Sequence, residues 1–124
     1  MANVMIVDDA MIVRKHLTTM LQNEGHTVVA EASHGLQAYC NYERYRPDVV
    51  TMDVNMPGMN GLETIEKIIK DFPDARIVVV SAFGTKTVIL DALQRGAKNY
   101  ILKPISQEKV AQAVKEALAA ECEQ

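Results

Sequence analysis

The segment that decides the fold is residues 46–61, which read RPDVVTMDVNMPGMNG. A short, β-rich apolar run at 49–52 ends at the carboxylate of Asp53, and Pro57 and Gly58 then stop any regular element. This pattern predicts a buried strand with Asp53 at its carboxyl end, and in an open α/β sheet ligands bind at that edge. We therefore interpret Asp53 as the reactive residue of the chain.

Asp53 has a second interpretation, in which it only starts a turn or caps the helix that begins near Gly61. Asn60 fills the cap position better, because Asn60-Gly61-Leu62-Glu63 is a variant of the capping box with Glu63 at the third helical position. Asp53 is then left without a structural role, which favours a chemical one.

The length and composition of the chain fit one globular domain. Its 124 residues suffice for a single hydrophobic core and are too few for two ordinary domains, so we expect one domain over 1–124. Hydrophobic residues at 48% and charged residues at 23% lie near globular averages and argue against a disordered or fibrous chain. The net charge of -3, with 13 basic residues scattered among 16 acidic ones, argues against direct contact with nucleic acid.

The N-terminal sequence and the cysteines indicate a cytoplasmic protein without membrane contact. The apolar run at 4–7 is too short for a signal peptide or a membrane span. Cys40 and Cys122 lie on separate predicted helices without metal-type spacing, so we expect inert thiols in a reducing compartment. The histidines also lack the spacing of a zinc site, and we interpret them as surface or loop residues. They are His16, His26 and His34.

Apolar patterns along the chain alternate between strands and helices five times. Short apolar runs predict strands at 4–7, 27–32, 49–52, 77–80 and 99–102. Apolar residues at helical spacing predict helices at 11–24, 35–45, 61–72, 85–95 and 107–120. Such alternation, with strands that are continuous apolar runs, predicts an α/β fold. We expect a doubly wound, five-stranded parallel sheet covered on both faces by five helices.

Polar residues follow four of these strands at the carboxyl edge of the sheet. They are Asp8 and Asp9, Asp53, Ser81 and Lys103. Neighbouring strands lie about 4.8 Å apart, so these side chains can meet. At about 4 Å and an effective dielectric near 20, two like charges repel by about 4 kcal/mol, so three carboxylates need a bound cation. Lys103 supplies one positive charge, and ligation by oxygen atoms suits Mg²⁺. We take Asp8 and Asp9 as metal ligands; Asp9 could also cap the first helix.

Together these residues resemble the receiver domains of two-component response regulators, over essentially the whole chain. The resemblance rests on Asp8-Asp9 after the first strand, Asp53 with Met56-Pro57-Gly58 and Gly61 after the third, Ser81-Ala82 after the fourth and Lys103-Pro104 after the fifth. Each motif is weak alone, and the set is specific. The resemblance implies a flavodoxin-like fold with strand order 2-1-3-4-5.

The resemblance implies a phosphorylation-activated signalling switch of a two-component or phosphorelay system, chemotaxis being one such pathway. Asp53 would accept a phosphoryl group from a histidine kinase or histidine phosphotransfer protein. The chain would promote its own aspartyl phosphorylation and dephosphorylation without being an enzyme in the usual sense. A carboxylate needs no base, so positioning and charge neutralisation by Lys103 and Mg²⁺, or Mn²⁺ in its place, would suffice. Asp8 or Asp9, Asp53 and the backbone carbonyl of Asn55 would hold the ion.

The resemblance also implies how the signal is read. Ser81 would hydrogen-bond the new phosphoryl oxygen and pull its loop inward, while Tyr100 changes between exposed and buried rotamers. An aromatic residue on the last strand could instead simply pack against a helix. A monomer that can dimerise on phosphorylation would present the fourth helix, fifth strand and fifth helix to its target. By elimination, the exposed members of that face are Asp91, Gln94, Arg95, Asn99, Tyr100, Gln107, Glu108 and Ala111.

Two loop residues and one peptide bond complete the expected site. Asn55 and Phe83 each lie two residues beyond a site residue, and we expect them to modulate the access of water to the phosphoryl group. Phe83 could instead pack on the neighbouring helix. The Lys103-Pro104 bond corresponds to a cis peptide bond of the family.

Three other functions compete with this interpretation. An aspartyl phosphatase of the haloacid dehalogenase type needs a second Asp two residues after the first, where this chain has Asn55. A flavodoxin-like FMN module needs a hydroxyl- and Gly-rich phosphate loop after the first strand, where Asp8 and Asp9 would repel phosphate. A receiver cut from a longer DNA-binding regulator stays open, although the polar C-terminal sequence ECEQ favours a free-standing protein.

Overall fold

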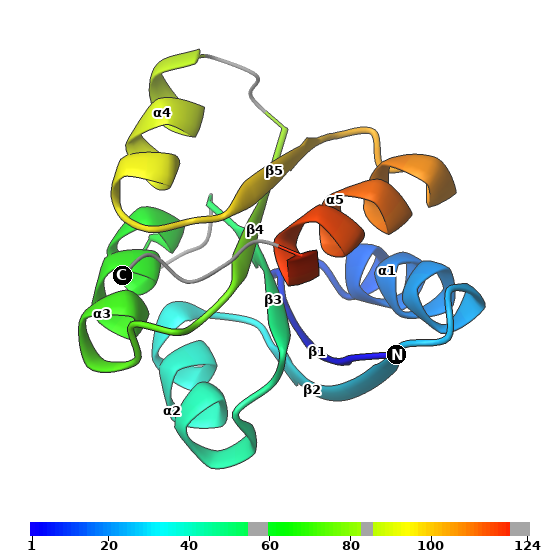
Figure 1. The fold of residues 1–124 in the computed structure, drawn as a ribbon, viewed down its shortest axis with the longest axis horizontal. Coiled ribbons are helices and arrows are strands. Elements are labelled where there is room, and N and C mark those ends of the chain that lie inside the picture. Colours follow the sequence, from blue (N-terminus) through cyan, green and yellow to red (C-terminus); the bar gives the residue numbers. More distant parts are fainter. Residues whose placement is uncertain (55–59, 83–85, 120–124) are drawn as a thin grey trace.

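The computed structural model describes residues 1–54, 60–82 and 86–119, which form five strands and five helices in strict alternation (Figure 1). The strands are β1 (Asn3–Val7), β2 (Thr27–Ala32), β3 (Val49–Asp53), β4 (Ile77–Ser81) and β5 (Asn99–Leu102). The helices are α1 (Met11–Asn23), α2 (Gly35–Tyr45), α3 (Gly61–Asp71), α4 (Lys86–Gln94) and α5 (Gln107–Ala119). All strands pair in parallel in the order β2-β1-β3-β4-β5, as the resemblance implied.

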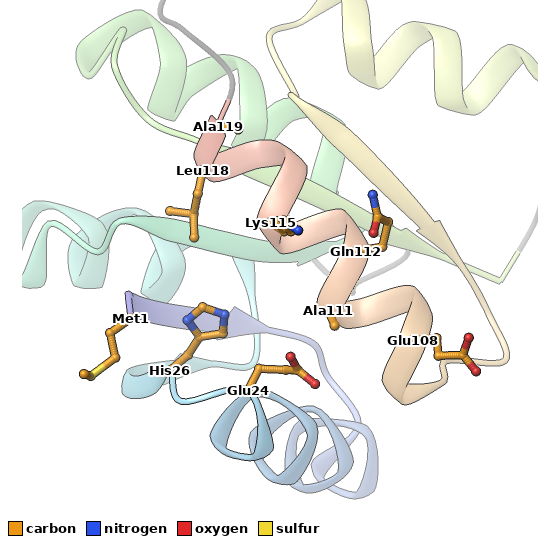
Figure 2. A pocket seen from close by; sticks show the side chains of 9 residues that line it. All are labelled: Met1, Glu24, His26, Glu108, Ala111, Gln112, Lys115, Leu118 and Ala119. Carbon is orange, nitrogen blue, oxygen red and sulfur yellow. The ribbon is translucent and has the colours of Figure 1, made fainter.

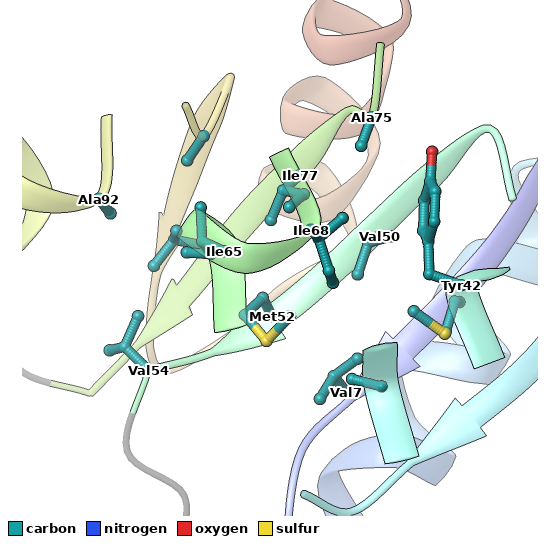
Figure 3. Close-up of a cluster of buried hydrophobic side chains, with 14 of the residues drawn as sticks. Val7, Tyr42, Val50, Met52, Val54, Ile65, Ile68, Ala75, Ile77 and Ala92 are labelled. Atoms are coloured by element: carbon teal, nitrogen blue, oxygen red, sulfur yellow. The ribbon is translucent and has the colours of Figure 1, made fainter. Parts of the chain in front are cut away.

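Helices cover both faces of the sheet: α1 and α5 lie on one side, and α2, α3 and α4 on the other (Figure 1). Successive strand residues point to opposite faces, so β3 sends Val50 and Met52 to one core and Val49 to the other. Figure 3 shows the first core, where Val50 and Met52 pack against Ile65 and Ile68 of α3. Burial on both faces explains why β3 and β4 are largely apolar before their polar last residues.

The ends of β3 and β4 place two site residues within the sheet itself, at β3 as predicted and at β4 one residue beyond the predicted end. The apolar run of the third strand ends at Met52, yet β3 continues to Asp53, which lies opposite Val80 of β4. Likewise β4 continues to Ser81, which lies opposite Leu102. The backbone of the sheet therefore fixes the positions of both polar residues, Asp53 and Ser81.

The structure confirms one predicted helix cap and shows that another is wrong. Asn60 caps α3, because its Oδ1 accepts the N–H of Glu63 at 2.9 Å. Asp9 does not cap α1: the cap residue is Ala10, which makes no side-chain capping hydrogen bond. The carboxylate of Asp9 lies instead with those of Asp8 and Asp53.

Other expectations concern the histidines, the cysteines and membrane contact. His26 and His34 have structural partners: Nδ1 of His26 accepts the N–H of Ala2 at 3.1 Å, and Nδ1 of His34 accepts that of Gln37 at 3.3 Å. Cys40 is exposed and free, and Cys122 lies outside the described residues. Among the described helices, none has the length and apolar character needed to span a membrane.

Candidate functional site

The carboxyl edge of the sheet brings together the polar residues that follow or end its strands. Asp8 follows β1, Asp53 ends β3, Ser81 ends β4 and Lys103 follows β5. These four strands are consecutive neighbours in the sheet, so residues far apart in sequence line one edge. This is the arrangement that the sequence predicted.

Three carboxylates form a compact cluster at this edge. One carboxylate oxygen from each of Asp8, Asp9 and Asp53 lies within 4.8 Å of the others. The residues Asp8 and Asp53 are only 1% and 4% exposed, whereas Asp9 is exposed. Like charges about 5 Å apart repel by about 3 kcal/mol per pair at an effective dielectric near 20. The cluster therefore favours a bound cation, and its donor set of carboxylate oxygens is the one that Mg²⁺ takes.

Asp8 is held firmly at the centre of the site. Its N–H donates to the carbonyl oxygen of Ala32 at 3.0 Å, and its Oδ1 accepts the N–H of Ala10 at 2.9 Å. Its Oδ2 lies 3.5 Å from the Nζ of Lys103, whose side chain is 26% exposed. The carboxylate is thus oriented between the loop after β1 and the ammonium group that follows β5.

Ser81 and Lys103 are linked through the backbone. The N–H of Lys103 donates to the carbonyl oxygen of Ser81 at 2.9 Å, and Ser81 is only 1% exposed. The Lys103–Pro104 peptide bond is cis, as the resemblance implied. A displacement of Ser81 therefore bears directly on the backbone of Lys103.

The remaining predicted residues lie further out or outside the described residues. Asn55 and Phe83 are outside them. Tyr100 is 42% exposed and lines a pocket of about 320 Å³ with Lys109, Gln112 and Glu116 of α5. Tyr100 is thus partly exposed beside α5, and both interpretations of its role stay open.

Three members of the expected target face lie elsewhere on α5. Gln107 donates from Nε2 to the carbonyl oxygen of Met20 at 2.9 Å and to a carboxylate oxygen of Glu24 at 2.8 Å. It therefore joins α5 to α1. Glu108 and Ala111 line a pocket of about 890 Å³ that also includes Met1, Glu24 and His26 (Figure 2). The side of α5 beside β5 carries Lys109, Gln112 and Glu116 instead.

The pocket in Figure 2 is remote from the acidic cluster in the topology of the sheet. Its residues Met1 and His26 lie just before the starts of β1 and β2, two residues and one residue away, so the pocket lies by the amino edge of the sheet. None of the polar strand-end residues lines it. The chemistry of the chain therefore belongs to the carboxyl edge.

One residue at the site was missed from the sequence. Arg14 of α1 donates from NH1 to the carbonyl oxygen of Asp8 at 2.6 Å and pairs through Nε with Oε1 of Glu31 at 2.9 Å. Its place in the sequence, in the first turns of a helix, does not indicate that its side chain contacts Asp8 and Glu31.

Comparison with known proteins agrees with this geometry. The family model of the response regulator receiver domain matches residues 4–115. The chain belongs to this receiver domain family. The chemotaxis protein CheY of Listeria monocytogenes is 38% identical over 117 residues, which cover 94% of this chain and 98% of that protein. CheY of Thermotoga maritima is 40% identical over 111 residues, covering 90% and 92%.

A solved structure gives the same result. A chain of the CheX-CheY-BeF3-Mg+2 complex from Borrelia burgdorferi superposes with a TM-score of 0.92 and 34% identity. The match covers 95% of this receiver and 90% of that chain. The fold is therefore the flavodoxin-like receiver fold that the resemblance implied.

Family membership gives the general function. A receiver domain is a phosphorylation-activated signalling switch that works with a histidine kinase and with downstream target proteins. Receiver domains bind Mg²⁺ through acidic residues, and the Asp8, Asp9 and Asp53 cluster offers such a set. This membership decides against the phosphatase and flavin alternatives.

Proposed function

We propose that this receiver accepts a phosphoryl group on Asp53 and promotes both this phosphorylation and its reversal, in a chemotaxis-type pathway of the cytoplasm. The observation that carries the proposal is the cluster of three carboxylates beside an ammonium group, with Asp53 only 4% exposed. The chemotaxis pathway is supported by relatives named CheY, which this chain matches over nearly their whole length.

The proposed reaction moves a phosphoryl group between two side chains. A carboxylate oxygen of Asp53 forms a bond to phosphorus while the bond from phosphorus to the imidazole nitrogen of the donor histidine breaks. The bonding electrons stay on that nitrogen as a lone pair, the neutral imidazole keeps its proton on the other ring nitrogen, and Asp53 becomes an acyl phosphate. Asp53 needs no general base, so the site has to position it and neutralise negative charge. Lys103 brings an ammonium group to this edge, 3.5 Å from the carboxylate of Asp8.

Asp8, Asp9 and Asp53 would hold the metal ion of the family. Bound Mg²⁺ would supply positive charge to the oxygens of the transferring phosphoryl group. The carbonyl of Asn55, outside the described residues, would be a further ligand. Mn²⁺ can replace Mg²⁺ because both accept sets of oxygen ligands.

Ser81 and Tyr100 would report phosphorylation to the surface. The hydroxyl group of Ser81 would donate a hydrogen bond to a phosphoryl oxygen. The hydrogen bond from the N–H of Lys103 to the carbonyl oxygen of Ser81 would carry the resulting shift toward β5. Tyr100, two residues before the end of β5 and 42% exposed, would then turn inward. Asn55 and Phe83 would govern how fast water reaches the phosphoryl group.

The target protein would bind the face formed by α4, β5 and α5. The side of that face between β5 and α5 combines polar and charged side chains with apolar ones; the lining includes Tyr100, Lys109, Gln112 and Glu116 beside Ile101, Leu102 and Ala113. Such a surface suits transient binding. Residues 1–124 would form a single receiver domain, monomeric until phosphorylation and able to dimerise afterwards.

Phosphotransfer from a radiolabelled, phosphorylated chemotaxis histidine kinase tests the proposal. Label should pass to the wild-type chain within minutes and should not pass to the Asp53→Asn variant. Label that stays on the kinase, or that reaches Asp53→Asn as fast as wild type, would contradict it.

A further inference from the structure

Arg14 ties the backbone of the acidic pair to strand β2. Its NH1 donates to the carbonyl oxygen of Asp8 at 2.6 Å, while its Nε pairs with Oε1 of Glu31 at 2.9 Å. The Arg14 side chain is 16% exposed. Because a guanidinium group is planar and rigid, the two bonds fix its orientation together.

Two backbone groups also hold Asp8, one on β2 and one in the loop that follows Asp8. Its N–H donates to the carbonyl oxygen of Ala32, and its Oδ1 accepts the N–H of Ala10. Both of these partners are backbone groups. The bond from Arg14 to the Asp8 carbonyl is made by a side chain, so a substitution can remove it without changing the acidic residues.

The carbonyl of Asp8 lies in the peptide plane that joins Asp8 to Asp9. The orientation of this plane sets ψ of Asp8 and φ of Asp9, and hence the directions in which both side chains leave the backbone. The carboxylates of these two residues lie within 4.8 Å of that of Asp53. A hydrogen bond that fixes this one plane therefore acts on two of the three carboxylates.

We propose that Arg14, braced by Glu31, is a positioning residue that fixes the Asp8–Asp9 peptide plane and so aims both carboxylates at the metal position beside Asp53. This inference rests on the proposed function, since it concerns the Mg²⁺ site of that function. Arg14 itself does not contact the ion or the phosphoryl group.

The sign of the effect separates positioning from simple electrostatics. Removing a positive charge near three carboxylates makes the cluster more negative, which by charge alone would strengthen Mg²⁺ binding. Releasing the peptide plane lets the carboxylates leave their positions, and this weakens Mg²⁺ binding. Outer groups that orient metal ligands typically change metal affinity about 10- to 100-fold when removed. Positioning should therefore outweigh the charge effect.

Calorimetric titration of the full chain with MgCl₂, without any phosphoryl donor, measures this directly. We expect Arg14→Met, which keeps the aliphatic stem, to bind Mg²⁺ about ten-fold more weakly than wild type. Arg14→Lys should fall between the two, because an ammonium group lacks the fixed fork. Glu31→Gln should lose less than about five-fold, because its ion pair is half exposed.

Arg46→Met is the matched control. Arg46 also donates from Nε to a backbone carbonyl, that of Glu43 at 3.3 Å, and also packs its guanidinium group, 4.3 Å from the ring centroid of Phe72. It lies before β3, away from the carboxyl edge of the sheet. We expect the Arg46→Met variant to bind Mg²⁺ with the same affinity as wild type.

A second readout needs no metal. The N–H of Ala10 is held by Oδ1 of Asp8, so amide hydrogen exchange at Ala10 should be faster in metal-free Arg14→Met than in wild type and Arg46→Met. Wild type that binds no Mg²⁺ would overturn the proposed function itself. Wild-type affinity or tighter binding in Arg14→Met would overturn only the role of Arg14. If Arg14→Met does not fold, wild-type affinity in Arg14→Lys would overturn it equally.

Discussion

Gly61, the first residue of α3, packs directly against the backbone of Asp53. A Cβ atom added to Gly61 would lie 2.5 Å from the α carbon of Val54 and closer still to the carbonyl oxygen of Asp53. Both partners are backbone atoms, which cannot move aside as a flexible side chain can. The absence of a side chain at Gly61 therefore allows α3 to begin against the end of the strand that carries Asp53.

Gly61→Ala should damage the site as well as the fold. The extra methyl group should push the end of β3 away, costing about 1–3 kcal/mol in the free energy of unfolding. Because a shift of about 1 Å at a reacting group can cost about 100-fold in rate, phosphorylation by acetyl phosphate should slow at least about ten-fold. Urea unfolding and intact-mass kinetics measure the two effects.

Gly96→Ala separates the effect on the fold from the effect on the site. Gly96 has φ of 121° and lies against Ile69, before β5, so alanine is strained there without touching Asp53. The Gly96→Ala variant should unfold at a lower urea concentration than wild type. Its folded form should still be phosphorylated at the wild-type rate. Equal slowing in both variants would contradict a specific role for Gly61.

Lys103→Ala should separate metal binding from activation. The Nζ of Lys103 lies 3.5 Å from Oδ2 of Asp8, so its removal leaves the carboxylates more negative and should not weaken Mg²⁺ binding. The change that beryllium fluoride induces in the NMR signals of Tyr100 should shrink, because Lys103 no longer draws the phosphoryl mimic toward β5. Weaker Mg²⁺ binding in this variant would place Lys103 in the support of the metal ligands instead.

Charge reversal on α4 tests the proposed target face. Arg95 pairs through Nε with Asp91 at 2.8 Å and through NH1 with Glu66 at 2.7 Å, and the hydrogen bond to Asp91 raises the pKa of Arg95. Exchanging the charges, as Asp91→Lys with Arg95→Glu, keeps an ion pair between α4 and the residue just after its end, and gives up the pair with Glu66. The urea midpoint of unfolding should change little, because these groups are partly exposed.

The target is first isolated from cell extract as the protein that wild type retains when it is activated with beryllium fluoride. The Asp91→Lys, Arg95→Glu variant should be phosphorylated at the wild-type rate. It should bind this target less tightly than wild type does. A control exchange of charges at exposed positions of α2, Glu43→Lys with Arg44→Glu, should leave this binding unchanged. Equal losses from the two faces would defeat the assignment.

His26 should make the fold less stable in mild acid. Burial and then the positive charge of the Met1 amino group lower the pKa of His26 below 6.5, against the opposing effect of Glu24. The N–H of Ala2 also needs an unprotonated Nδ1 at 3.1 Å. Between the lowered folded pKa and the unfolded pKa of 6.5, the unfolded chain binds more protons. The contribution of His26 is therefore complete above pH 6.5 and is lost as the pH falls through the folded pKa.

Urea unfolding at a series of pH values measures this dependence. His26→Gln should flatten it below pH 6.5, whereas His16→Gln, at an exposed position of α1, should leave it as in wild type. A wild-type slope in His26→Gln would show that other groups cause the loss.

The sequence predicted the elements and the acidic edge for simple physical reasons. Strands buried on both faces must be largely apolar, as β3 and β4 are before their polar last residues, and parallel strands must all end at one edge. A charge directly after such a strand, as at Asp8, can therefore be placed from the sequence alone.

Contacts between elements could not be predicted in this way. Helical spacing shows that Gln107 is not a core residue, but it does not show that its amide reaches Met20 of α1. Arg14 was missed for the same reason, since its partners lie on two other segments. The capping role left open for Asp9 is wrong, and the sequence could not decide it because the cluster that holds its carboxylate is assembled only by the folded sheet.

The central claim is that Asp53 is the phosphoryl acceptor and that acceptance depends on a divalent cation. Intact mass spectrometry after incubation with acetyl phosphate and MgCl₂ tests it most directly. Wild type should gain one phosphoryl group, and Asp53→Asn should gain none, as should wild type in excess chelator. An adduct that forms at full yield on Asp53→Asn, or equally well in excess chelator, would contradict the claim.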